Sequence, residues 1–563
     1  MNENKAQECI HQAVLDSLSW LDELPSQETR ILEKTKKEAV PLVTVYHGNQ
    51  ETTISPAYSP ASARTRISRL RPLLAMSAVI VLIVGFWFVK HPGSVSVLPD
   101  TVTQPVSSTG PSPDQETLSP ALPAAVSGLN ESNAELPLDR IDLYVEPDLL
   151  WNNETGILAD GDEIEKEPGK LPFKNSVYRK MKDSGQKVKG ELIYQSDEGA
   201  VLFRDQVRLC LAGDFSLDMP QKSFLIDAED GSFDFPLFDD RTAVSYPSIL
   251  LRNSGNDSMW TRVQDGVQHR LIDRYTDTGL LTQAWRPVNV YLNDEYWGIY
   301  NMRETIDGHT ICRHEQVPDD LADEVTILRG MGSSADQGSR TEFLLTRNKI
   351  KTGSPAENPE DLAFLEQEID IDNFLDWFTV EMYFGNSDIG NAVVYKVPGG
   401  KWKCLIKDLD YALYNSKFDS VKSYLKEAGM GEQGIDNSIF LKILSVDKYK
   451  DLFFTKLGNL FRTLSTENMW KELDVCIAWI EPSMKAHVER WAPYYDKNVI
   501  MEVPTDPEAA WKYWQKRVDR LRNVMYKRPT MLYQFIQNYF NMRKSEMDAY
   551  FPSDIPATVD DLL

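Results

Sequence analysis

An uncharged apolar stretch near the N-terminus constrains this chain most. Residues 72–89, PLLAMSAVIVLIVGFWFV, carry no charged side chain and are just long enough to cross a bilayer as a helix. Residues 64–71 hold four arginines, whereas residues 91–139 hold no Lys or Arg. The positive-inside rule therefore predicts a single-pass membrane protein with a cytoplasmic N-terminus and an extracytoplasmic C-terminal domain.

The composition on either side of this stretch predicts the remaining organisation. Residues 1–71 form a polar cytoplasmic segment, and residues 72–89 form the transmembrane helix. Residues 90–137 are rich in Ser and Pro and are expected to be an extracytoplasmic tether, because such a stretch cannot bury enough apolar surface to fold. Residues 138–545 form the globular domain, and residues 546–563 a C-terminal tail. The net charge of −25 argues against nucleic acid as a partner, because phosphate binding needs a basic surface.

Strand-like segments precede helix-like segments in residues 138–545, which predicts an α+β fold. The first half holds short β-rich runs such as QVRLCLAG, KSFLIDA and RPVNVYLND, with a hairpin around Asn293 and Asp294. The stretch DLAFLEQEIDIDNFLDWFTVEMYF places apolar residues on a helical stripe. A hairpin, AVVYKVPGGKWKCLIKD, follows with its turn at Pro398, Gly399 and Gly400, and helical segments dominate residues 448–540.

Two acids, Asp408 and Asp410, end the apolar strand WKCLI, although burying an unpaired carboxylate is costly. Asp388 and Asn391 stand one short hairpin upstream. Clusters of Asp and Asn oxygens suit hard cations such as Mg²⁺, and phosphoryl transfer uses such cations. Taken alone, the DLD segment is also typical of a structural turn in which an Asp caps the next segment. The upstream Asp and Asn favour a metal site.

The order of the candidate residues along the chain resembles that in eukaryotic-type kinases. Those enzymes have a Lys on a strand, a Glu on a helix, and then an Asp, an Asn and a metal-binding Asp around a hairpin. The same order is present here as Lys222, Glu304, Asp388, Asn391 and the pair Asp408 and Asp410.

Several longer stretches, in the same order, resemble the CotH kinase family, which is named for spore coat protein H. RPVNVYLNDEYWGIYNMRETID resembles the family's hairpin leading into its REXID motif, and LLRNSGNDSMWTRVQDGVQHRL resembles its LRNxGND segment. IDIDNFLDWFTVEMYFGNSDIGN and KWKCLIKDLDYAL resemble its helix, its Asn-x-Asp segment and its DxD strand. The resemblance covers most of residues 143–540.

This resemblance implies an atypical protein-kinase-like fold, with a β-rich N-lobe and a helical C-lobe, preceded by the single transmembrane helix. It implies transfer of the γ-phosphate of ATP, with Mg²⁺ or Mn²⁺, to Ser or Thr hydroxyls of extracytoplasmic or envelope proteins. Lys222 would hold the nucleotide phosphates, and Glu304 would orient it through an ion pair. Asp388 would accept the substrate proton. The metal would be bound by Asn391 and by one or both of Asp408 and Asp410.

The chain departs from the family pattern around two of these residues. LAGDFSL, before Lys222, has no Arg, and Asp214 within it would repel phosphate unless it faces away. Only Asn391 follows Asp388 where the family often has two consecutive Asn. The alternative is a catalytically inactive CotH-like structural or binding protein of the cell envelope. In that case the motifs would hold the fold through a buried ion network of Arg252, Asp257, Arg303 and Glu304.

Overall fold

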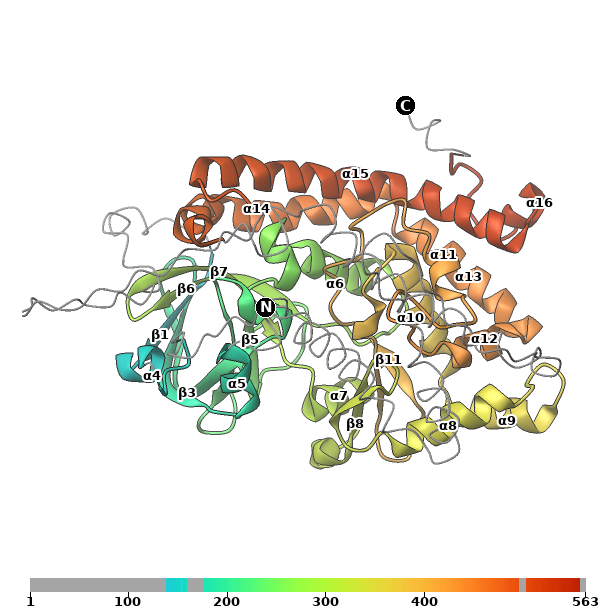
Figure 1. Cartoon of the computed structure of the whole chain (residues 1–563), viewed down its shortest axis with the longest axis horizontal. Helices are drawn as coiled ribbons and strands as arrows, with labels where there is room; N and C mark the ends of the chain where they lie inside the picture. The colour runs from blue at the N-terminus through green and yellow to red at the C-terminus, as the bar shows by residue number, and fades with distance from the viewer. Residues whose placement is uncertain (1–137, 153, 159–176, 496–502, 557–563) are drawn as a thin grey trace, which may run out of the picture. The chain divides into compact units, whose positions relative to one another are not determined.

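The computed structural model describes residues 138–152, 154–158, 177–495 and 503–556 (Figure 1). The predicted cytoplasmic segment, membrane span and tether lie outside the described residues, as does the end of the predicted tail. None of the helices within the described ranges combines the length and the apolarity needed to cross a membrane.

Seven strands of the described chain close a barrel in the order β1–β2–β3–β4–β5–β7–β6. Their bounds are β1 Arg140–Val145, β2 Val188–Gln195, β3 Val201–Ala212, β4 Ser223–Ala228, β5 Ser248–Arg252, β6 Trp285–Leu292 and β7 Glu295–Glu304. Along β1, every second side chain joins the apolar cluster that the barrel strands share: Ile141, Leu143 and Val145. The β6–β7 hairpin turns at Asn293 and Asp294, whose φ angles of 49° and 67° are those of a tight primed turn, as predicted.

The barrel corrects the predicted fold class. The described residues have the predicted α+β class, but their strands close a barrel and do not form the expected β-rich lobe of a kinase-like fold. β1 pairs with β2 in antiparallel fashion on one side and with β6 in parallel on the other, so this first strand leaves no free edge. The parallel pairing sets Arg140 opposite Asn289. Period-two patterns predict the faces of strands, but they do not reveal a closing contact between strands so far apart in sequence.

A second, four-stranded sheet has the order β11–β10–β8–β9. Its strands are β8 Thr326–Arg329, β9 Ser334–Gln337, β10 Val393–Lys396 and β11 Lys403–Leu405. β10 and β11 form the predicted hairpin, with Gly399 in its turn at φ 72°. The register sets Arg329 and Leu405 both opposite Val393. The end of β8, the start of β10 and the end of β11 therefore lie at the same end of the sheet.

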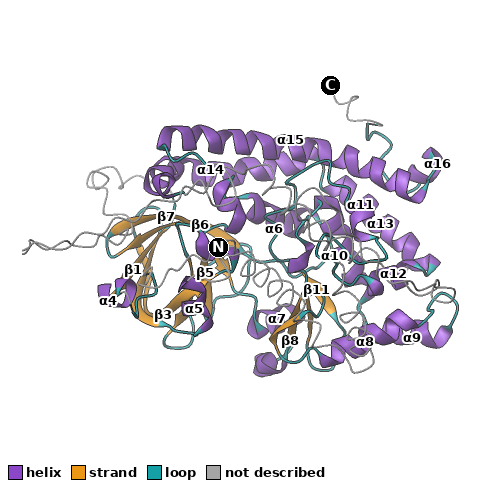
Figure 2. Cartoon of the chain, viewed as in Figure 1, coloured by secondary structure: helices purple, strands orange, loops and turns teal. Residues whose placement is uncertain are grey.

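Helices make up most of the second half of the described chain (Figure 2). The helices that precede β10 are α4 Pro147–Trp151, α5 Val177–Asp183, α6 Gln264–Tyr275, α7 Gly308–Glu315, α8 Thr341–Thr352, α9 Pro359–Glu368 and α10 Ile371–Phe384. Those that follow β11 are α11 Ser420–Tyr424, α12 Ser438–Leu444, α13 Asp447–Thr463, α14 Thr466–Trp491, α15 Pro507–Phe540 and α16 Lys544–Met547. Short 3₁₀ turns are η4 Phe215–Asp218, η5 Gly255–Met259, η6 Asp319–Glu324, η7 Ile389–Asn391 and η8 Ala492–Tyr494.

The stretch predicted as one helical stripe before the hairpin forms two helices, α9 and α10. The helix is interrupted at Ile369 and Asp370. There the Asp370 side chain accepts a hydrogen bond from the Asn373 N–H and so caps α10. α10 ends at Gly385, which has a φ of 65°. Almost every side chain of α10 is buried, so this helix forms the centre of the helical part. It delivers the chain directly to Asp388.

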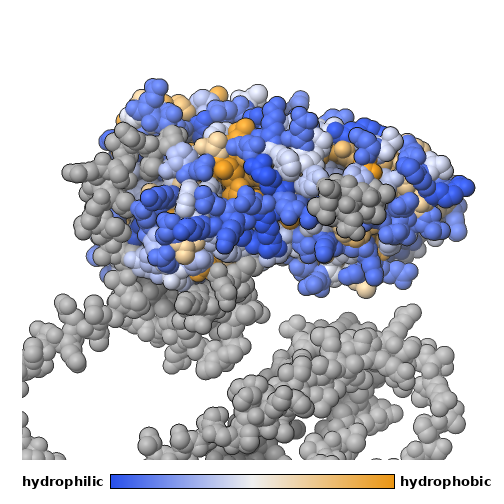
Figure 3. Space-filling view, turned by 90° about the horizontal axis from the view of Figure 1, so that it is seen from above, coloured by the Kyte–Doolittle hydropathy of each residue, from blue (hydrophilic) through white to orange (hydrophobic). Residues whose placement is uncertain are grey.

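The long helices α14 and α15 lie side by side (Figure 1). α14 also packs against β7, which joins the barrel to the helical part. The face seen in Figure 3 is mainly hydrophilic, with a small hydrophobic area near its middle. Apolar side chains are therefore largely withdrawn from this face into the two main cores.

Candidate phosphoryl-transfer site

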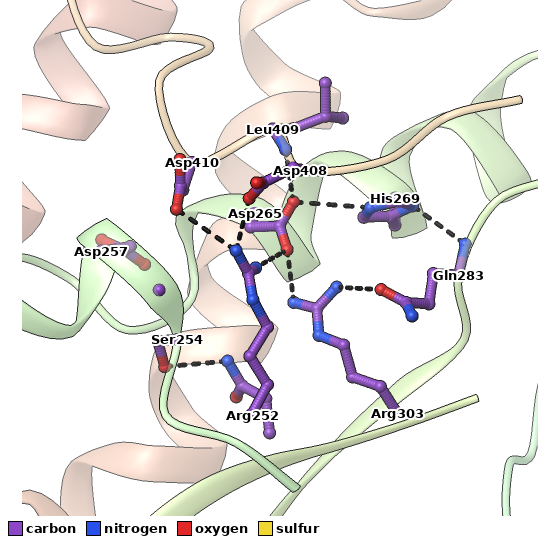
Figure 4. A network of polar contacts seen from close by, with 12 residues as sticks. Arg252, Ser254, Asp257, Asp265, His269, Gln283, Arg303, Asp408, Leu409 and Asp410 are labelled. Atoms are coloured by element: carbon purple, nitrogen blue, oxygen red, sulfur yellow. Dashed lines mark hydrogen bonds and ion pairs between the residues drawn. The ribbon is translucent and has the colours of Figure 1, made fainter. Parts of the chain in front are cut away.

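The DLD segment turns sharply just after β11. Asp408 has a φ of 58°, in the left-handed region that Asp adopts more readily than most residues. The two acids of the segment meet one guanidinium group, that of Arg252 at the end of β5 (Figure 4). Arg252 Nη2 donates a hydrogen bond to Asp408 Oδ1 and lies 3.3 Å from Asp410 Oδ2. The segment is therefore fixed to the barrel through charge.

Asp388, Asn391 and Asp408 converge, and we call them the acid cluster. The Asn391 side-chain amide donates to Asp388 Oδ2 and to Asp408 Oδ2, both at 3.0 Å. Gln433 donates to the other oxygen of Asp388 at 2.9 Å. Burial and the charge of Asp408 raise the pKa of Asp388. Of the predicted site residues, these three are the ones that the structure brings together directly.

Asp410 lies next to the acid cluster in a different environment. Its side chain is 1% exposed, whereas that of Asp408 is 28% exposed. Asp410 Oδ2 accepts a hydrogen bond from the Asn256 N–H at 2.9 Å, while the buried Asp410 Oδ1 has no hydrogen-bond partner among the described residues. Burial and the neighbouring Asp408 raise the pKa of Asp410 well above its ordinary value. A ligand arriving from solvent can thus reach Asp408 more easily than Asp410.

A buried arginine network, formed by Arg252, Arg303 and Asp265, lies next to Asp408 of the acid cluster (Figure 4). Asp265 Oδ2 lies 2.5 Å from Arg252 Nη1 and 2.7 Å from Arg303 Nη2. Asp265 Oδ1 accepts the Leu409 N–H at 2.7 Å, which ties α6 to the middle of the DLD segment. Burial acts to raise the pKa of Asp265, but Arg303 and Arg252 together hold it well below its ordinary value.

The predicted pair of Lys222 and Glu304 is not formed. The Lys222 amine is buried and donates to the Leu217 and Met219 carbonyls at 2.8 and 2.6 Å. The Tyr300 hydroxyl reaches the Lys222 carbonyl, and Glu304 lies four residues further along β7. At the usual rise along a strand, Glu304 lies about 13 Å along β7 from Tyr300, the residue next to Lys222.

Glu304 has other partners in the described chain. Its two oxygens pair with Arg241 at 3.2 Å and with Arg313 at 3.0 Å. The buried ion network considered as a structural alternative therefore exists in a different form. Arg252 and Arg303 share Asp265, not Glu304. The Asp257 carboxylate instead accepts the backbone N–H groups of Thr261, which follows η5, and of Gln264 at the start of α6, both at 2.8 Å.

Two acids near the site had not been predicted from the sequence, Asp265 and Glu381. Glu381 lies in α10, and burial, together with Asp265, Asp408 and Asp388, raises its pKa to about 8. Its Oε2 atom is buried without a hydrogen-bond partner among the described residues. For Glu381 the signal in the sequence is a charged side chain within a largely apolar helical segment, which does not identify its partners, and Asp265 in the polar α6 gives no such signal.

The residues present fit a hard cation in part. No group of three or more His, Cys, Asp or Glu side chains in the described ranges is arranged to hold a metal ion. The predicted set, however, includes an amide, that of Asn391. The buried Asp410 Oδ1 without a hydrogen-bond partner, close to a second carboxylate, is the kind of atom that a cation or a proton would satisfy. Asn391, Asp408 and Asp410 could therefore hold such an ion at this edge.

Two hollows in the described chain lie elsewhere. One is lined by residues that include Trp260 and His487, and the other lies around the hairpin turn at Pro398. Neither is lined by a residue of the acid cluster. The chemistry of the site therefore depends on converging side chains and not on either hollow.

Comparison with known proteins agrees with the resemblance found in the sequence. No curated protein matches the chain. A family model described as CotH kinase protein matches residues 210–532, which is more than half of the 563 residues. The matched range contains Lys222, Glu304 and the whole acid cluster. The chain therefore belongs to the CotH kinase family.

Proposed function

We propose that this protein transfers the γ-phosphate of ATP to Ser or Thr hydroxyls of a protein substrate. The convergence of the acid cluster carries the proposal. Asn391 donates to one oxygen of Asp388 and to one of Asp408, so both carboxylates face the same small region. Asp408 is partly open to solvent there, so a ligand can approach.

Asp388 is suited to accept the proton of the attacking hydroxyl. Its raised pKa makes it a better proton acceptor than an ordinary Asp. As the hydroxyl oxygen forms its bond to the γ-phosphorus, its proton passes to Asp388. The bond from the γ-phosphorus to the bridging oxygen breaks, and ADP leaves with that electron pair. The hydrogen bonds from Asn391 and Gln433 hold the Asp388 carboxylate in place.

Asn391, Asp408 and Asp410 are the residues that would hold Mg²⁺ or Mn²⁺. A bound divalent ion supplies neutralisation of the phosphate charge during transfer. Arg252 contributes a fixed positive charge beside Asp408 and Asp410, and it keeps their side chains pointing to one place. Of the two acids, Asp408 is the more accessible to a ligand.

A second candidate is a catalytically inactive structural or binding protein. The contacts of Arg252 favour it, because this arginine already pairs with Asp408 and Asp410 without a metal. The separation of Lys222 and Glu304 also favours it. Their roles in nucleotide binding, an extracytoplasmic location and an envelope substrate remain predictions.

The test is phosphate transfer by the full-length protein. The protein is incubated with ATP labelled in the γ-phosphate, Mg²⁺ or Mn²⁺, and generic protein acceptors. Label should appear on Ser or Thr, and Asp388→Asn should reduce its rate by at least about 100-fold, the usual range for a general base. Asp230→Asn, at an exposed barrel loop, is the matched control and should keep the wild-type rate. If no acceptor is labelled although ATP and metal stabilise the protein, the binding-protein candidate is favoured.

A further inference from the structure

Two cations, Arg329 and Lys407, lie at the end of the four-stranded sheet that presents the acid cluster, and a third, Lys182 of α5, is linked to Arg329 through Asp214. Arg329 ends β8 opposite Val393 at the start of β10, and Val393 is also opposite Leu405 at the end of β11. Asn391 precedes the start of β10 by two residues, and Lys407 follows the end of β11 by two residues. The register therefore brings Arg329 and Lys407 to the same end of the sheet as Asn391 and Asp408.

Lys407 has no hydrogen bond or ion pair with any residue in the described ranges. It immediately precedes Asp408, and its side chain is half-buried. The nearest acids, Asp336 and Asp408, pair with Arg329 and Arg252 instead, so the Lys407 ammonium group is left to interact with a further anion.

The barrel places a carboxylate among these cations. Asp214 follows Gly213, whose φ of 104° allows the chain to turn after β3. Asp214 Oδ1 lies 2.7 Å from Lys182 Nζ, and Asp214 Oδ2 lies 3.6 Å from Arg329 Nη1. The Asp214 side chain is 53% exposed, so both ion pairs are weak and screened. Asp214 thus does not face away from the candidate site but links a barrel loop to β8.

We propose that Lys182, Arg329 and Lys407 form the site for the phosphate chain of a nucleoside triphosphate, and that Asp214 occupies part of this site until that ligand displaces it. The proposal rests on the proposed function only for the identity of the ligand. A polyphosphate chain carries several negative charges and many acceptor oxygens, whereas Asp214 offers one charge through two exposed ion pairs. The polyphosphate chain can therefore replace the Asp214 carboxylate and also bind Lys407.

Binding of inorganic tripolyphosphate to the full-length protein tests this without requiring catalysis. Calorimetric titrations are made at low ionic strength and without metal, so that the cations are not screened. Asp214→Asn removes the competing charge and should tighten binding about three- to tenfold, the range expected from two exposed ion pairs. Lys407→Met and Arg329→Gln should each weaken binding at least about tenfold, since each removes a charge-assisted contact.

Matched controls separate local effects from a change in total charge. Lys401→Met lies in the turn of the same hairpin, at its opposite end, and Asp230→Asn lies in another barrel loop. Both should leave the affinity within twofold of wild type. Lys407→Met should fold at least as stably as wild type, because the amine has no partner to lose in the described chain.

The outcomes distinguish this proposal from the proposed function. Tripolyphosphate binding that follows the predicted order, without any phosphate transfer from ATP, would support the anion site and count against the kinase. Phosphate transfer by a protein whose affinity for tripolyphosphate is unchanged in all three variants would overturn the anion site and leave the kinase standing. An unchanged affinity in Asp214→Asn alone would overturn the role of Asp214.

Discussion

The buried arginine network and the acid cluster share the contact between Arg252 and Asp408, yet they differ in how their charges are satisfied. In the network, Asp265 accepts from Arg252 and from Leu409 and is paired with Arg303. In the acid cluster, two carboxylates meet on a neutral amide, that of Asn391, and one of them is partly exposed. The charged groups of the network form ion pairs with one another without a ligand, whereas the cluster gathers negative charge that a cation would stabilise. Substitutions in the first should affect stability, and those in the second should affect ligand response.

The largest effect is expected from Asp265→Asn. It leaves Arg252 and Arg303 buried without their shared counter-charge, so the free energy of unfolding should fall by about 3–5 kcal/mol. Denaturant unfolding of the metal-free protein measures this. The control is Asp230→Asn, which should stay within about 0.5 kcal/mol of wild type. A loss no larger than that of the control would show that the network does not hold the fold.

Glu381→Gln should change how stability depends on pH. The pKa of Glu381 is about 8 in the folded protein, and its ordinary value is 4.5. The stability that the neutral Glu381 carboxyl contributes is therefore fully present below pH 4.5. It is then lost as the pH rises from 4.5 through 8. Gln stays neutral, so the unfolding free energy of the variant should exceed that of wild type at pH 8 by on the order of 4 kcal/mol, with little difference at pH 4. Denaturant unfolding of both metal-free proteins at pH 4 and pH 8 measures this. If the difference in unfolding free energy between variant and wild type is the same at both pH values, the raised pKa is contradicted.

Lys222→Met should cost about 1–2 kcal/mol of unfolding free energy, because two buried carbonyls lose their donor. Lys189→Met on β2, whose side chain is 73% exposed, is the control and should have almost no effect. If Lys222 stays on the Leu217 and Met219 carbonyls when nucleotide binds, ATP should still raise the melting temperature of the variant. Loss of that response, with a normal response in the control, would return Lys222 to the role predicted from the sequence.

The sequence predicted the elements better than their assembly. The β6–β7 hairpin and the β10–β11 hairpin were predicted because their turn residues and alternating patterns are local. Barrel closure was not, since it depends on pairing between β1 and β6. A similar distinction applies to the site. Asp388, Asn391 and Asp408 come together around one hairpin, as their spacing indicates.

Contacts between distant segments were not predicted. The sequence order alone suggested that Lys222 and Glu304 would pair, but the strand register separates them, and each finds nearer partners. Asp265 was missed because its partners come from β5, β7 and the DLD segment, which only the tertiary fold brings together.

Asp408→Asn combines the smallest expected change in stability with the largest change in ligand response. Without ligand, loss of its partly exposed pair with Arg252 is offset by relief of repulsion from Asp388 and Asp410, so the unfolding free energy should change by less than about 1 kcal/mol.

The central claim is tested most directly by thermal melts of wild type, Asp408→Asn and Asp265→Asn, each with and without Mg²⁺ and ATP. We expect ligand to raise the melting temperature of wild type. Ligand should also raise the melting temperature of Asp265→Asn, from a lower starting value. Asp408→Asn should melt at the wild-type temperature without ligand and lose the part of the ligand response that depends on Mg²⁺. If wild type does not respond to Mg²⁺ and ATP, and Asp408→Asn is as destabilised as Asp265→Asn, then the acid cluster belongs to the structural network and the proposed phosphoryl-transfer site is contradicted.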